Sequence, residues 1–154
     1  MNYRDNDARC LLKNNLMKLS KQQLKLFYGI LVHGWACRRA FISTQDIFNL
    51  WCELNEYCHE ADEGFPDPYG DCELLKSFCH AHPYYFIDIL EPGLIANLFC
   101  EYLDNRLDIL TAVAQKLNTE GLRAAYEYSN AVLNLADDID ESVAQIEEHI
   151  QLFP

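Results

Sequence analysis

Residues 52–82 hold four of the seven cysteines and three of the five histidines, the densest group of metal-ligating side chains in the chain. The group consists of Cys52, Cys58, His59, Cys72, Cys79, His80 and His82. Zinc prefers thiolate and imidazole ligands, but structural zinc sites usually place two cysteines two to four residues apart, and no pair here has that spacing. We therefore predict no cofactor and interpret these groups as buried thiols and polar histidines. A metal site remains the open alternative, with its ligands drawn from Cys58, His59, Cys79, His80 and His82.

Two further patterns that would suggest metal chemistry are incomplete. An acidic loop offers five carboxylates: Asp62, Glu63, Asp67, Asp71 and Glu73. Prolines replace ligand positions of an EF-hand in this loop and its glycine is misplaced, so a solvated loop is the better interpretation. His59-Glu60 is not followed by a second histidine at the required position, which excludes the helical zinc-protease pattern.

Nucleophilic catalysis by a cysteine and a histidine has no signature in this sequence. Every cysteine lies in or beside a predicted helix, and none is flanked by a glycine turn. The chain also lacks a glycine-rich phosphate loop of either common type. We therefore predict a protein that is not an enzyme, with a small metal-dependent enzyme as the weakest alternative.

Charge is strongly segregated along the chain, whose formal net charge is -12. Residues 1–39 hold eight of the twelve Lys and Arg and two acids (+6), whereas residues 40–154 hold four basic and 22 acidic residues (-18). The basic third could contact phosphates through Lys13, Lys18, Lys21, Lys25, Arg38 and Arg39. The attached -18 would repel a nucleic acid, so we expect these cations to neutralise acidic helices within the fold or across a homodimer.

The acidic residues give the strongest functional indication. Carboxylates three and four positions apart on a helix lie roughly 5–6 Å from one another, so they form a rigid row of negative charge. Such a row would attract a basic groove that is built for nucleic acid. The residues we predict to act as phosphate-like contacts are Glu101, Asp104, Asp108, Asp137, Asp138, Asp140 and Glu141.

A long amphipathic helix is predicted to position the first of these acids. It runs from Gly93 to Leu117, with apolar residues at steps of three and four on one face and acids on the other. A turn is predicted at residues 118–121. The last segment repeats the pattern, and its apolar phase slips near Asp138 and Asp140. This slip is compatible either with one helix from Thr119 to Leu152 or with a break between two helices.

The first half of the chain also reads as helices. We predict helices over 5–19 and from Ser20 to Cys37, the second opened by a Ser20–Gln23 capping box and apolar on nearly every side. Within it, Gly29 and Gly34 indicate either the close approach of a neighbouring helix or a bend. Ser43 and Asp46 signal a third helix, the loop 61–70 follows it, and Asp71 is expected to cap a short helix that ends at Pro83. Residues 84–90 are compatible with a short helix or a strand, and we favour the helix because no other segment offers a strand partner.

These patterns predict a single all-α domain over residues 1–154, a bundle of five to seven helices with a long C-terminal antiparallel helix pair. No stretch is long and apolar enough to span a membrane, and unpaired cysteines suggest a reducing cytoplasm. We expect a binding protein that inhibits a nucleic-acid-processing protein by occupying its basic surface, as immunity, antitoxin or phage anti-defence proteins such as anti-CRISPRs do. The alternative is a helical adaptor that receives its partner in an apolar groove.

Overall fold

The computed structural model describes residues 3–38, 40–43, 45–46, 49, 100–103 and 106–152. Within these ranges the helices with defined bounds are α1 (Tyr3–Met17), α2 (Lys21–Arg38), α7 (Leu107–Thr119), α8 (Leu122–Leu133) and α9 (Ile139–Leu152). Residues 100–102 are helical as well, and the described ranges contain no strand. The prediction of an all-α bundle is therefore confirmed. The helices and loop expected between residues 50 and 99, with the cysteine–histidine group at 52–82, lie outside the described residues.

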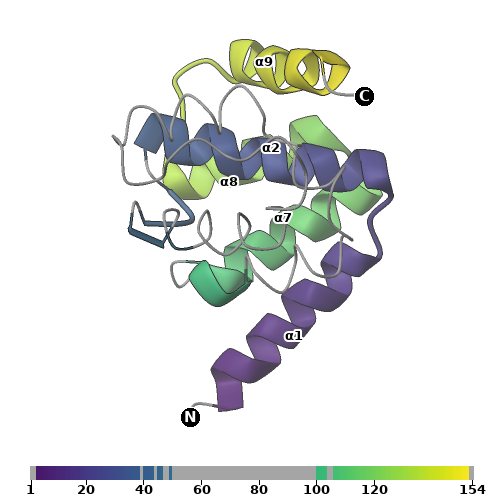
Figure 1. Ribbon diagram of the computed structural model, residues 1–154. Coiled ribbons are helices and arrows are strands. Elements are labelled where there is room, and N and C mark those ends of the chain that lie inside the picture. Colours follow the sequence, from purple (N-terminus) through teal and green to yellow (C-terminus); the bar gives the residue numbers. More distant parts are fainter. Residues whose placement is uncertain are drawn as a thin grey trace, which may run out of the picture.

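The helices are stacked around one apolar core (Figure 1). α7 packs against α1, α2 and α8, while α9 packs against α2 and α8 on the other side of the bundle. The largest fully buried side chains come from α1, α2, α8 and the segment after α2: Tyr126, Phe27, Phe41, Leu12, Leu16, Leu24, Ile30 and Ile42. Because apolar burial dominates folding free energy, these side chains fix how the outer helices are placed.

A capping box forms the corner between α1 and α2. The backbone N–H of Gln23 donates to Oγ of Ser20 at 3.1 Å, and the N–H of Ser20 donates to Oε1 of Gln23 at 2.9 Å. These bonds satisfy two backbone donors that a helix start leaves open, as the sequence predicted. α1 ends at Met17 rather than Leu19, because the N–H of Leu19 turns back to the carbonyl of Leu16 at 3.1 Å.

The chain reverses sharply after α2, and Gly34 makes this possible. The N–H of Ala40 donates to the carbonyl of Gly34 at 3.2 Å, and Phe41 adopts a φ of 74°. The ring of Phe41 then lies so close to α2 that a Cβ atom on residue 34 would be 2.7 Å from its Cε2. Gly34 therefore allows a close approach, but the neighbour is the ring of Phe41 in the segment after α2 rather than the predicted neighbouring helix.

The predicted single helix from Gly93 to Leu117 is wrong, because the helix is interrupted. Residues 100–102 are helical, Leu103 forms an isolated antiparallel bridge with Ile42, and α7 begins only at Leu107. Leu103 and Ile42 are both buried, so the chain packs against the segment that follows α2 at the point where the helix is interrupted. The apolar period passes unchanged through the break, which is why the sequence pattern does not reveal it.

The C-terminal part consists of short helices rather than a long pair. The predicted turn is present: α7 ends at Thr119, and α8 starts after Gly121, whose φ of 102° suits glycine. α8 ends at Leu133, where Asn134 adopts a left-handed conformation and donates its N–H to the carbonyl of Asn130 at 2.8 Å. α9 follows as a separate helix, so the alternative of a break is the correct one. No described helix is long and apolar enough to cross a bilayer.

Candidate functional site

The outer surface of α9 carries the densest exposed group of carboxylates that the structure describes. We call it the α9 carboxylate face, and it consists of Asp137, Asp138, Asp140, Glu141, Glu147 and Glu148, all exposed. Val143 and Ile146 lie on the opposite side of the helix and are buried against the bundle. Because apolar residues recur at steps of three and four, the helix turns its four acids of this group toward solvent, and Asp137 and Asp138 are exposed in the turn before it.

The remaining predicted contacts lie elsewhere. Glu101 lies in the helical residues 100–102 and Asp108 in the first turn of α7, and both are exposed. In the view of Figure 1, α7 lies below α2 and α9 lies above it. Asp104 lies outside the described residues. The α9 carboxylate face therefore brings four of the predicted acids together, whereas Glu101 and Asp108 lie on other elements.

Described cations lie close to some of the predicted acids. Arg9 and Lys13 of α1 lie close enough to Cys100 to lower the pKa of its thiol, although burial is the larger effect and raises that pKa to about 11. Glu101 is the next residue along the chain, so its charge is placed beside the basic helix α1. On the α9 carboxylate face, the described cation that pairs with an acid is Arg123.

Two of the acids on α9 have local structural partners. Asp140 forms an ion pair with the guanidinium of Arg123, which also contacts Glu127 at 3.3 Å. The hydrogen bond to Asp140, and then its charge, raise the pKa of Arg123. Asp138 caps α9, because its Oδ1 accepts the N–H of Glu141 at 3.1 Å. Among the residues described, no cation pairs with the four other acids: Asp137, Glu141, Glu147 and Glu148.

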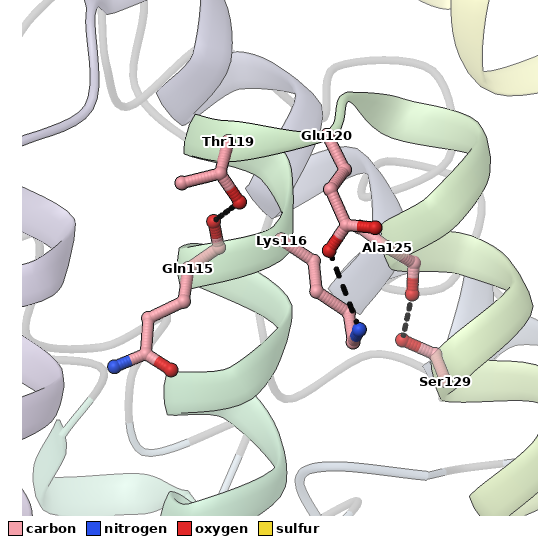
Figure 2. A network of polar contacts seen from close by, with 6 residues as sticks. All are labelled: Gln115, Lys116, Thr119, Glu120, Ala125 and Ser129. Atoms are coloured by element: carbon pink, nitrogen blue, oxygen red, sulfur yellow. Dashed lines mark hydrogen bonds and ion pairs between the residues drawn. The ribbon is translucent and has the colours of Figure 1, made fainter.

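Polar groups at the α7–α8 turn are satisfied locally (Figure 2). The ammonium of Lys116 lies 3.4 Å from the carboxylate of Glu120 and 5.5 Å from the ring centre of Tyr128. The hydroxyls of Thr119 and Ser129 donate to backbone carbonyls four residues earlier. Such bonds stabilise helix surfaces and ends, so this network offers no group for ligand binding.

The basic N-terminal third does not present all its cations to solvent. Lys25 is buried, with 2% of its surface exposed, and Arg38 donates from Nε to the carbonyl of Asn134 at 3.1 Å. Lys18 and Lys21 are exposed at the corner between α1 and α2, and Arg39 lies outside the described residues. The described part of this region is therefore a set of separate cations rather than a continuous basic stripe.

A polar network that the sequence did not single out crosses the core between three helices. Nε2 of His33 on α2 lies 3.0 Å from the hydroxyl of Tyr126 on α8 and 3.5 Å from Sγ of Cys37 on α2. Ser142 of α9 hydrogen-bonds to the same tyrosine hydroxyl. His33, Tyr126 and Ser142 are buried, while Cys37 is exposed. The only sequence signal is the four-residue spacing of His33 and Cys37, which puts them on one helix face.

The protonation of this network follows from its surroundings. Burial raises the pKa of Tyr126, the hydrogen bond from Ser142 lowers it, and the nearby Cys37 raises it. Tyr126 therefore keeps its proton at neutral pH. The direction of its hydrogen bond to Nε2 of His33 depends on the histidine tautomer. The same nitrogen is within reach of the Cys37 thiol.

The part of the chain that the structure describes holds no cluster of three or more His, Cys, Asp or Glu side chains suited to a metal ion. No protein-family model matches the chain, and neither a curated protein nor a solved structure matches it.

Proposed function

We propose that this chain is an acidic binding protein that inhibits a nucleic-acid-processing protein by occupying its basic surface, and that α9 provides the contact. The observation that supports the proposal is the α9 carboxylate face. It gathers six exposed acids on one outer helix and its preceding turn, and only one described cation, Arg123, pairs with any of them.

The density of charge on this face approaches that of a nucleic-acid strand. Four of the carboxylates lie on the helix itself, between residues 140 and 148, a length of roughly 12 Å at about 1.5 Å per helical residue. That is about one charge per 3 Å, close to the about 3.4 Å per phosphate of a single strand. Glu141 and Glu148 lie two helical turns apart, as do Asp140 and Glu147, so the acids form two parallel rows.

The rest of the chain supports a steering role for these charges. The net charge of -12 attracts a basic partner over long range, and separated rows of carboxylates align with the lysines and arginines of a phosphate-binding groove. Binding of this kind blocks the groove without a catalytic group. It also weakens with salt, because exposed charges are screened within about 10 Å at 0.1 M ionic strength.

The test compares two variants that lose the same charge at different places. One carries Glu141→Gln, Glu147→Gln and Glu148→Gln on α9, and the control carries Asp7→Asn, Glu120→Gln and Glu127→Gln, three exposed acids that are not among the predicted contacts. Immobilised wild-type protein is expected to retain a basic nucleic-acid enzyme from host lysate at 50 mM salt and release it at 500 mM. The α9 variant should lose this partner while the control keeps it. Equal retention by both variants, or a partner that resists high salt, would overturn the proposal.

A further inference from the structure

The thiol of Cys37 has the two features of a reactive cysteine: it is exposed, and an imidazole nitrogen lies 3.5 Å from its sulfur. Cys37 lies in the last turn of α2, where the negative end of the helix dipole disfavours a thiolate. A neighbouring base is therefore needed to draw the proton away. His33 occupies the position one turn earlier, and its ring is buried, so little water competes for Nε2.

The buried hydroxyls behind His33 allow it to take that proton without losing a hydrogen bond. Before proton transfer, the one lone pair of Nε2 faces both the hydroxyl of Tyr126 at 3.0 Å and the thiol of Cys37 at 3.5 Å. When Nε2 is protonated, the Tyr126 oxygen becomes the acceptor of the new N–H and its own proton turns toward Ser142. The network thus accommodates both charge states of His33, which an apolar environment would not.

We propose that Cys37 is a site of oxidation by hydrogen peroxide, with His33 as the proton acceptor. His33 takes the thiol proton, and the thiolate sulfur attacks one peroxide oxygen. The S–O bond forms as the O–O bond breaks, and the departing hydroxide takes the proton back from His33 and leaves as water. Sulfur loses two electrons, the peroxide gains two, and Cys37 ends as a sulfenic acid. An oxidant this small reaches an exposed thiol without a binding pocket.

The chain contains its own reference thiols. Cys10 on α1 is exposed like Cys37, but no histidine hydrogen-bonds to it within the described residues. Cys100 is buried with 6% of its surface exposed, so its protection from labelling reports that the fold is intact. The comparison of Cys37 with Cys10 in one wild-type sample therefore measures the effect of the imidazole without any substitution.

The test treats the reduced full-length protein with hydrogen peroxide and dimedone, which traps sulfenic acids, and quantifies each cysteine by peptide mass spectrometry. A thiol pKa lowered by one unit increases the thiolate tenfold but reduces its nucleophilicity, so Cys37 is expected to react at least about threefold faster than Cys10. His33→Gln, which keeps a hydrogen-bonding side chain but cannot take a proton at neutral pH, should bring Cys37 to the rate of Cys10.

Two results would overturn the proposal. The first is a wild-type Cys37 that reacts no faster than Cys10. The second is an unchanged rate for Cys37 in His33→Gln while Cys100 stays protected. Where Cys100 becomes reactive and shows that the variant has unfolded, the wild-type comparison alone decides. The proposal concerns α2 and stands or falls independently of the α9 carboxylate face.

Discussion

The hydroxyl of Tyr126 lies 3.0 Å from Nε2 of His33, a contact between α8 and α2 that joins residues 93 positions apart. Their rings also pack edge to face, with centroids 5.5 Å apart. Because Ser142 of α9 hydrogen-bonds to the same hydroxyl, Tyr126 connects α2, α8 and α9. The orientation of α9, and with it the carboxylate face, depends on this buried connection as well as on apolar packing.

Removing this hydroxyl should destabilise the fold. In Tyr126→Phe the ring is kept, but Nε2 of His33 and the hydroxyl of Ser142 lose a partner in the core. The free energy of unfolding should fall by about 1–3 kcal/mol, the cost of leaving buried polar groups unsatisfied. Urea denaturation followed by circular dichroism measures it. Tyr128→Phe is the matched control, since that tyrosine is only partly buried, and a similar loss in both variants would contradict the assigned role.

Gly34 should tolerate no side chain. Gly34→Ala places a Cβ atom 2.7 Å from Cε2 of Phe41, a fully buried ring that cannot move away freely. The expected destabilisation is about 1–3 kcal/mol, typical of an overpacked core. Thermal unfolding of Gly34→Ala, Phe41→Leu and the double variant forms a cycle that tests the cause. The double variant should lose less stability than the sum of the single ones, whereas strict additivity would show that the two residues do not clash.

The cap of α9 is a separate test of the acidic turn. Asp138→Ala removes the acceptor for the N–H of Glu141, and it should cost about 0.5–2 kcal/mol of stability. Hydrogen exchange at the first turn of α9 should accelerate at the same time. Asp137→Ala removes an equal charge next to it without removing a described bond, and we expect a change within about 0.5 kcal/mol. Equal effects of the two substitutions would assign the loss to charge instead of to capping.

These local features differ in how far the sequence reveals them. The Ser20–Gln23 box depends on residues three apart, and so does the start signal after α2, where Oγ of Ser43 accepts the N–H of Asp46 at 3.1 Å. Both were predicted because the interacting groups are neighbours in the chain. The break before α7 was missed because it depends on the pairing of Leu103 with Ile42, 61 positions earlier, which leaves the apolar period of the helix unchanged.

In the candidate sites, too, the sequence reveals the contacts between chain neighbours but not those between distant segments. Exposure of the acids on α9 follows from the helical period, so their clustering was predictable, but the separation of Glu101 and Asp108 from them depends on how the helices are stacked. The spacing of His33 and Cys37 is visible in the sequence, whereas the partner that orients His33 comes from α8. Only tertiary structure brings Tyr126 to that position.

The free energy of unfolding should fall in alkaline solution because the thiol of Cys100 ionises more readily in the unfolded state than in the folded state. Burial raises the pKa of this thiol to about 11, against a usual value near 9, so the folded state keeps the proton longer than the unfolded state does. The stabilisation is therefore complete below about pH 9 and is lost as the pH rises to about 11, by an amount of the order of 2 kcal/mol. Burial also raises the pKa of Tyr28 above 10, which extends the loss to higher pH.

The contribution of the thiol can be separated by substitution. Cys100→Ala should be less stable at neutral pH because it leaves a small cavity, yet its free energy of unfolding should change less between pH 9 and pH 11 than that of the wild type. Urea denaturation at a series of pH values measures both quantities. Parallel curves for the two proteins would show that Cys100 does not ionise differently in the two states.

The central claim is that the α9 carboxylate face occupies a surface that otherwise binds nucleic acid, and competition tests it most directly. A labelled oligonucleotide bound to the captured partner is titrated with the wild-type protein or with the variant Glu141→Gln, Glu147→Gln, Glu148→Gln, and fluorescence anisotropy reports the bound oligonucleotide. We expect full displacement by the wild type and at least about tenfold weaker displacement by the variant. A stable ternary complex of partner, oligonucleotide and wild-type protein would contradict it.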